Sequence, residues 1–206
     1  MSQAAFDPLP RPVVLGSTSR YRAQLLSRLK LQFEVAAPEV DETAQPGEPP
    51  QELARRLALA KAWAVAARFP EAVVIGSDQV ADLAGEPLGK PGTHAKATDQ
   101  LRLMRGRTVV FHTAVAVVCA ATGFEQLDLA PVKVRFRQLL DAEIETYLRA
   151  EQPYDCAGSA RSEGLGIALL ESIDSDDPTA LVGLPLIRTC ALLRAAGLDP
   201  VAHASA

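Results

Sequence analysis

Residues 72–79, Ala-Val-Val-Ile-Gly-Ser-Asp-Gln, decide the fold that this sequence predicts. The apolar run from Ala72 to Ser77 is typical of a buried strand, and the polar residues Asp78 and Gln79 follow it directly. A carboxylate placed just past a buried strand lies at the rim of a sheet, where α/β proteins bind ligands. Asp78 is therefore a candidate catalytic residue, although its side chain could instead bond only to its own turn.

Upstream of this stretch, strand and helix patterns alternate. Val13–Gly16 is another short apolar run, and a hydroxyl residue at 17–19 is suited to cap the helix that follows it. Apolar residues at helical spacing mark two helices, and a Pro-rich acidic loop precedes the second. The predicted elements are a strand at 13–16, a helix at about 20–30, a strand at 33–36, a loop at 38–50 and a helix at about 51–68.

Downstream, a long β-branched run from Thr108 to Ala120, a turn at Gly123 and a returning segment from Phe124 to Phe136 predict an antiparallel hairpin. The other predicted elements are a loop at 88–92, a helix at 94–104, strands at 108–120 and 124–136, a helix at 141–150, a loop at 157–166, a strand at 167–170 and a helix at 184–196. This order indicates a mixed α/β fold with a twisted, partly antiparallel sheet flanked by helices, in two lobes around a central cleft. We expect one domain at 13–197, between an irregular N-terminal tail at 1–12 and a C-terminal tail at 198–206.

Composition limits the possible partners. The chain has 206 residues, of which 48% are hydrophobic and 22% charged, which is typical of a globular protein. A net charge of −4 argues against a nucleic-acid partner. No apolar run approaches the ~20 residues that span a bilayer, and residues 1–12 lack a secretory pattern, so we expect no membrane partner. Three cysteines without paired spacing predict reduced thiols and a cytoplasmic location.

Residues 15–22, Leu-Gly-Ser-Thr-Ser-Arg-Tyr-Arg, form a candidate phosphate site. Backbone N–H groups at a helix start attract anions, Ser17 adds a hydroxyl, and Arg22 can fork onto phosphate oxygens. The alternative is a capped helix with solvated arginines. The P-loop pattern GxxxxGK[ST] and the hydrolase pattern GxSxG are both absent.

Two carboxylates from separate loops can share a divalent cation. Asp41 and Glu42 lie in the Pro-rich loop, and together with Asp78 they offer the oxygen ligands that Mg²⁺ or Mn²⁺ prefers. Lys61 and Lys90 could each hold a phosphate as a point charge. The alternatives are a solvated acidic loop, a lysine whose stem lies along an apolar face, and an exposed loop cation.

Residues 156–164, Cys-Ala-Gly-Ser-Ala-Arg-Ser-Glu-Gly, pack small residues around one arginine and one glutamate. Small residues let a ligand approach the backbone, and Glu163 could accept hydrogen bonds from the N–H groups of a nucleobase. A tight surface turn is the alternative.

The order of these segments resembles the Maf family of nucleotide pyrophosphatases. Seven blocks carry the resemblance from about Val13 to Gly197: LGSTSRYR, APEVDE, LALAKA, VIGSDQV, GKP, CAGSARSEG and LVGLPL. The SDQ and CAGSxxSEG blocks are similar to those of the subgroup that acts on 7-methyl-GTP. The sequence differs from common family members at Gly16 and Arg20, and Tyr21 stands where this subgroup is expected to have tryptophan.

The resemblance implies hydrolysis of a small-molecule nucleotide between its α and β phosphates, a divalent metal cation and often a homodimer. It implies the α/β fold of Maf and inosine-triphosphatase-like proteins, with a deep cleft between two lobes. It also implies that Asp78 is the proton acceptor, that Glu42 and Asp78 hold the metal, and that Ser17, Arg22, Lys61 and Lys90 handle phosphate. Tyr21, Gln79 and Glu163 fall on positions that select the base.

Two other functions stay open from the residues. The first is a pyrophosphatase that prefers dTTP, UTP or CTP, which comparative kinetics would distinguish. The second is a regulator that binds nucleotides without chemistry, which would have no need of a base at Asp78.

Overall fold

The computed structural model describes residues 10–204, so most of the expected tail at 1–12 lies outside the described residues. Within them, one sheet has the strand order β2-β1-β3-β5-β6-β7, with β4 paired to β3. β1 pairs in parallel with β2 and β3, and the other pairs are antiparallel, which confirms the mixed, partly antiparallel sheet. The strands are β1 Val13–Gly16, β2 Glu34–Ala36, β3 Val73–Leu83, β4 Glu86–Leu88, β5 Thr108–Cys119, β6 Phe124–Phe136 and β7 Leu170–Asp174.

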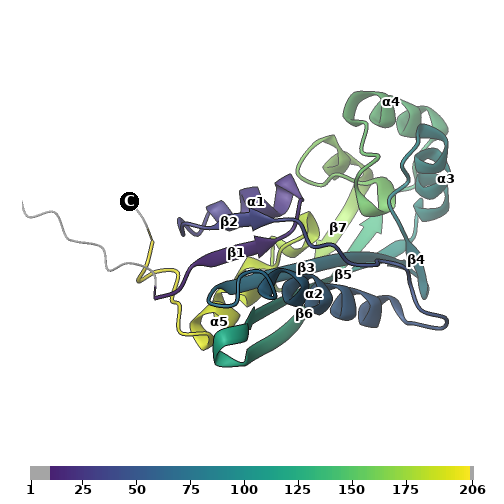
Figure 1. The fold of residues 1–206 in the computed structure, drawn as a ribbon. Coiled ribbons are helices and arrows are strands. Elements are labelled where there is room, and N and C mark those ends of the chain that lie inside the picture. Colours follow the sequence, from purple (N-terminus) through teal and green to yellow (C-terminus); the bar gives the residue numbers. More distant parts are fainter. Residues whose placement is uncertain (1–9, 205–206) are drawn as a thin grey trace, which may run out of the picture.

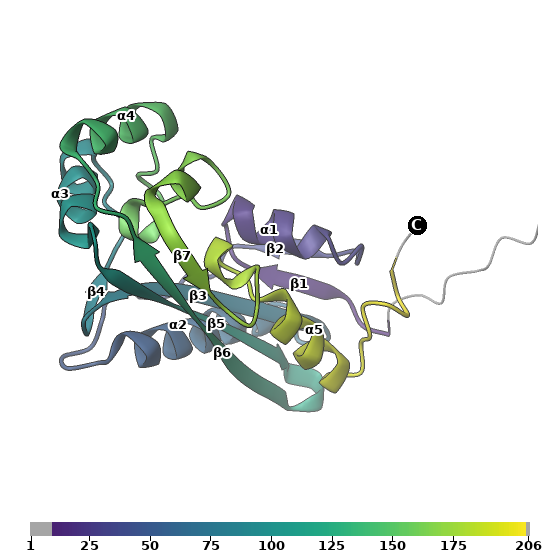
Figure 2. The same cartoon turned by 180° about the vertical axis from the view of Figure 1, so that it is seen from behind.

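Helices cover both faces of this sheet (Figures 1 and 2). α2 packs on β3 and β5 from one side, and α5 packs on β5 and β6 from the other. α1 shares the face of α5, while α3 and α4 cover the far end of the long strands. None of the helices among residues 10–204 is long and apolar enough to cross a bilayer. The helices are α1 Arg20–Ser27, α2 Pro50–Ala66, α3 His94–Met104, α4 Asp141–Glu151 and α5 Leu186–Ala195.

A gap in the pairing of β3 positions the site. On one side of β3, β1 pairs with residues 73–76 and β4 pairs with residues 81–83. β5 pairs with β3 on the opposite side, across residues 74–82. Residues 77–80 therefore have strand geometry and a neighbour on one side only. Since side chains alternate along a strand, Asp78 lies toward the α2 face and Gln79 toward the α5 face.

Gly76 brings α2 close to this gap. A Cβ at Gly76 would lie 2.3 Å from the Ala58 carbonyl oxygen and 2.6 Å from the Ala62 nitrogen. Such distances are far inside van der Waals contact, so β3 and α2 can pack this closely only with glycine here. The close approach places Lys61, on the same turn of α2, beside the start of the gap.

Several sequence predictions need correction. Asp78 lies inside β3 and not beyond its end, because the pairing with β5 continues to Asp82 and the pairing with β4 continues to Leu83. The strand predicted at 167–170 is wrong: Leu165–Leu169 is a 3₁₀ turn and the strand begins at Leu170. The chain turns there because Gly166 approaches the Arg161 backbone, where a Cβ would lie 2.4 Å from the carbonyl oxygen.

Other elements agree with the sequence or differ at their ends. The helix at 94–104 and the hairpin through Gly123 are confirmed. The first helix ends at Ser27 and not near residue 30, and the short strand β4 was not expected. Leu198, just beyond α5, is fully buried in the core that α1 and α5 share.

Candidate active site

A cavity of about 600 Å³ opens at the gap in β3. Its walls come from the start of α1, from α2, from β3, from the β4–α3 connection and from the segments around residues 156–163 and 181–183. This volume lies in the range of small-ligand sites. The structure brings to its lining all nine residues to which the family resemblance assigns a role: Ser17, Tyr21, Arg22, Glu42, Lys61, Asp78, Gln79, Lys90 and Glu163.

A nearly buried ion pair lies at the gap. Lys61 Nζ donates to Asp78 Oδ1 at 2.6 Å, and Glu42 Oε1 lies 2.6 Å from the same nitrogen. The Lys61 and Asp78 side chains are 6% and 10% exposed, whereas that of Glu42 is 58% exposed. The Lys61 stem therefore does more than lie along an apolar face, because its ammonium links carboxylates from a strand and a loop.

The charges around Glu42 keep it ionised. Partial burial acts to raise the pKa of Glu42, but the Lys61 hydrogen bond and the positive charges of Lys61, Lys90 and Arg22 outweigh burial. The pKa of Glu42 therefore lies below its ordinary value. The neighbouring Asp41 points elsewhere, since its carboxylate accepts from the Thr43 backbone within the same loop.

The helix start at 17–22 is organised around Arg22. The Ser19 side chain caps α1 by accepting from the Arg22 backbone N–H, as expected for this position. Arg22 Nε donates to the Gly183 carbonyl at 2.8 Å, and its Nη1 lies 3.4 Å from Ser17 Oγ. Burial lowers the pKa of Arg22, and the charges of Asp78 and Glu42 oppose that shift. Because arginine stays protonated in proteins, the guanidinium places a positive charge near the two carboxylates.

Arginines surround Tyr21 at the other end of the cavity. The Arg20 and Arg161 guanidinium carbons lie 4.8 Å and 5.5 Å from the Tyr21 ring centroid, and Arg20 donates to the Tyr21 hydroxyl. Arg161 also lies 3.4 Å from Glu163 Oε1 and 3.3 Å from Glu151 Oε2. The aromatic ring and the carboxylate thus already contact cations. Motif analysis did not predict that Arg20 and Arg161 would flank the Tyr21 ring.

The loop at 156–164 is held from α4. Tyr147, which is buried, accepts from the Arg161 backbone N–H and donates to the Ser159 carbonyl. Glu151 accepts from the Leu165 backbone N–H at 2.8 Å. Motif analysis did not find Tyr147 or Glu151, whose only sequence signal is a polar group on the buried side of a helix.

The cavity also contains a thiol. Cys156 lines it, and burial together with the nearby Asp155 carboxylate raises the pKa of the thiol to about 12. A thiol with so high a pKa stays protonated at neutral pH and is a poor nucleophile. The carboxylates, and not this thiol, are therefore the candidate catalytic groups of the site.

The donor set fits a magnesium-like ion that also binds phosphate. Among residues 10–204 no group of three or more His, Cys, Asp or Glu side chains comes together as a metal cage. Asp78 and Glu42 do converge, and one cation, the Lys61 ammonium, already lies within 2.6 Å of both. Mg²⁺ is commonly bound by one or two carboxylates plus substrate phosphates and water, which matches this pair.

Hydrogen bonds to the Glu48 carboxylate hold the loop that carries Glu42, and these bonds depend on pH. Hydrogen bonds from Arg56 and from the Gln45 backbone lower the pKa of Glu48 to about 2. Since the pKa falls on folding, the contact stabilises fully above the ordinary value of 4.5 and is lost as pH falls toward 2.

We therefore expect Glu48→Gln to lower the thermal unfolding midpoint most near neutral pH. The difference from wild type should shrink steadily through the acid range. A midpoint difference that stays constant from neutral pH to about pH 2 would contradict this role of Glu48.

An α/β sheet with cations and carboxylates gathered at an open strand edge defines a protein that binds an anionic ligand of nucleotide size. The chain belongs to the family of Maf-like proteins, whose model matches residues 12–196.

Three relatives share the name "7-methyl-GTP pyrophosphatase". One from a Polaromonas species is 74% identical over 194 residues, covering 94% of this chain and 89% of its own. One from Albidiferax ferrireducens is 70% identical over 192 residues, covering 93% and 96%. One from Cupriavidus pinatubonensis is 58% identical over 190 residues, covering 92% and 95%. The similarity therefore spans nearly the whole of this chain and of each relative.

Proposed function

We propose that this chain hydrolyses 7-methyl-GTP between its α and β phosphates, releasing 7-methyl-GMP and diphosphate. The observation that carries the proposal is the Lys61 ammonium held between Asp78 and Glu42, within a cavity that Arg22 and Lys90 also line. The names of the relatives support the choice of nucleotide.

At the phosphate end, Asp78 accepts a proton from the attacking water. A nearly buried carboxylate at an open strand edge is accessible to water on the cavity side, which a general base requires. Lys61, Lys90 and Arg22 neutralise the triphosphate and the leaving diphosphate, and the Ser17 hydroxyl can donate to a phosphate oxygen.

Asp78 and Glu42 would hold a divalent cation, Mg²⁺ or Mn²⁺. Bound there, the ion would polarise phosphate oxygens and lower the pKa of water. This part of the proposal predicts that a chelator abolishes turnover and that added Mg²⁺ or Mn²⁺ restores it.

At the base end, the positive charge of 7-methylguanine determines which side chains can recognise the base. A cation on an aromatic face gains about 0.5–2 kcal/mol, and the Tyr21 side chain lines the cavity. Glu163 can accept from the N1–H and N2–H₂ groups, and such charge-assisted bonds contribute about 1.5–3 kcal/mol each. A neutral thymine would gain less from both groups, which supports a methylated guanine over dTTP.

Glu163→Ala tests the base assignment. We expect kcat/KM for 7-methyl-GTP to fall about 10-fold or more, and that for UTP to change far less, because guanine offers this carboxylate two adjacent donor groups, N1–H and N2–H₂, whereas uracil offers only N3–H. Steady-state kinetics of wild type and variant on 7-methyl-GTP, GTP, dTTP and UTP would measure both the preference and its loss. An equal drop on every nucleotide would remove Glu163 from base selection, and a wild type that prefers dTTP or UTP would overturn the choice of substrate.

Two further parts of the proposal concern the whole molecule. Three free cysteines fit a reducing cytoplasm, and the family resemblance supports a homodimer. Light scattering on the purified chain would test the dimer.

A further inference from the structure

One backbone segment, residues 180–183, connects the two ends of the cavity. It follows the anchored turn at 175–179 and crosses β3 and β5 on the face opposite α2. Its carbonyl groups accept hydrogen bonds from both ends. Gln79 Nε2 donates to the Ala180 and Leu181 carbonyls at 2.9 Å and 3.0 Å, and Arg22 Nε donates to the Gly183 carbonyl at 2.8 Å.

These contacts fix the orientation of the Gln79 amide. Carbonyl oxygens can only accept, so the amide nitrogen must face Ala180 and Leu181. Thr113, which lies opposite Gln79 on β5, is a third acceptor, with its hydroxyl oxygen 2.9 Å from the same nitrogen, so three acceptors share the two amide protons. The Gln79 oxygen is thereby left as the acceptor that faces away from the segment, in a side chain that lines the cavity.

Thr113 belongs to this arrangement and not to the cavity wall. It is fully buried, and its hydroxyl donates to the Ala180 carbonyl at 2.9 Å while accepting from Gln79. On the same face, the buried Ser77 hydroxyl lies 2.8 Å from the Ala114 carbonyl and 3.0 Å from the Gly183 carbonyl, which share its one proton. The Gly183 carbonyl also accepts from Arg22. Each hydroxyl thus acts on a different end of the cavity through the same segment.

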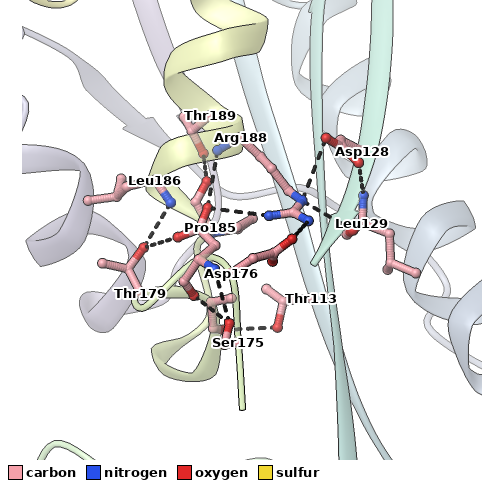
Figure 3. Close-up of polar contacts among 12 residues, drawn as sticks. Thr113, Asp128, Leu129, Ser175, Asp176, Thr179, Pro185, Leu186, Arg188 and Thr189 are labelled. Atoms are coloured by element: carbon pink, nitrogen blue, oxygen red, sulfur yellow. Dashed lines mark hydrogen bonds and ion pairs between the residues drawn. The ribbon is translucent and has the colours of Figure 1, made fainter. Parts of the chain in front are cut away.

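The segment is anchored at the start of α5 (Figure 3). Asp177, which is fully buried, accepts from the Thr179 hydroxyl at 3.1 Å and from the Arg188 backbone N–H at 3.1 Å. The Thr179 hydroxyl lies 2.8 Å from the Leu184 carbonyl and accepts from the Leu186 N–H, also at 2.8 Å. The Arg188 guanidinium lies between Asp128 and Asp176 (Figure 3). The polypeptide on both sides of 180–183 is therefore held in place.

We propose that segment 180–183 positions the base-recognising amide of Gln79 and the phosphate-facing Arg22, and that Thr113 and Ser77 are positioning residues that act through it. This inference rests on the proposed function. Thr113 acts on base choice, and Ser77 acts on all nucleotides alike, because Arg22 faces the phosphates that every nucleotide carries.

The isosteric variant Thr113→Val tests the proposal. Loss of one hydrogen bond from the Gln79 amide should reduce the ratio of kcat/KM for 7-methyl-GTP over UTP by about fivefold, with KM raised and kcat nearly unchanged. Thr113→Ser, which keeps the hydroxyl, should restore the ratio. Thr108→Val, on the exposed start of the same strand, is the matched control and should behave as wild type. Ser77→Ala should lower kcat/KM on every nucleotide by a similar factor and leave the ratio unchanged.

A double-mutant cycle separates positioning from damage to the fold. In a Gln79→Leu background, Thr113→Val should have no further effect on the ratio, because its target amide is gone. An undiminished effect there, or an equal loss on both nucleotides in Thr113→Val, would overturn the proposal. Thr113→Ala carries the same expectation if the valine variant does not fold.

The same double-mutant cycle can be measured by binding alone, from the dissociation constants of 7-methyl-GMP and UMP for each variant. A wild type that favours another base would overturn the proposed substrate, while the coupling between Thr113 and Gln79 would still be read from binding. Absence of coupling in both readouts would overturn the positioning role.

Discussion

Asp78→Asn is expected to lower kcat about 10³-fold while nucleotide affinity changes little. The amide keeps the shape of the carboxylate but cannot accept a proton from water at neutral pH. The Lys61 ammonium keeps Glu42 as a partner at 2.6 Å, so the variant should still fold. Diphosphate release from 7-methyl-GTP would measure turnover, and calorimetric titration with 7-methyl-GMP would measure binding.

Asp82→Asn is the matched control for this variant. Asp82 lies on the same strand and points to the same face, but it bonds to His112 and to the Gly85 backbone, away from Lys61. We expect turnover close to wild type. Normal turnover in Asp78→Asn would remove Asp78 from the chemistry and would favour a role in which the chain only binds nucleotides.

Lys61→Met is expected to impair both stability and activity. It leaves Asp78, whose side chain is 10% exposed, without the ammonium that it bonds, and breaking a buried ion pair costs about 3–5 kcal/mol. It also removes one of the cations that face the triphosphate, so kcat/KM should fall about 10²–10³-fold. Urea unfolding and steady-state kinetics would measure the two effects separately.

The double variant Lys61→Met/Asp78→Asn should regain much of the lost stability and none of the activity, because the uncompensated charge is gone. Lys90→Met is the control at an exposed loop position, where the free energy of unfolding should change by less than about 0.5 kcal/mol. A Lys61→Met protein as stable and active as wild type would show that the buried pair has neither role.

Local patterns along the chain predicted most elements of the fold. Buried runs and helical spacing placed the hairpin at 108–136 and the helix at 94–104, because each depends on neighbouring residues. The gap at 77–80 depends on the register of β1, β4 and β5 against one strand, which no local pattern encodes. This is why Asp78 was expected beyond a strand and lies within one.

The order of the sequence motifs predicted nine residues that the structure brings to one cavity. It did not predict which side chains these residues contact. Nothing in the isolated sequence links Lys61 to both Asp78 and Glu42, because the contacts span a helix, a strand and a loop. Thr113 could not be singled out from the sequence, because it lies in a β-branched run, where threonine is an ordinary strand residue. Its signal is burial of a hydroxyl group, which becomes visible only when the strands are paired.

A crystal structure with Mg²⁺ and a 7-methyl-GTP analogue whose α–β bridging oxygen is replaced by a methylene group would test the central claim most directly. We expect the α–β bridge to lie beside Asp78 and Lys61 at the gap in β3, with the methylated base next to Glu163 and Gln79. A triphosphate bound outside this gap, or an analogue bound with its base against Lys61, would contradict the account.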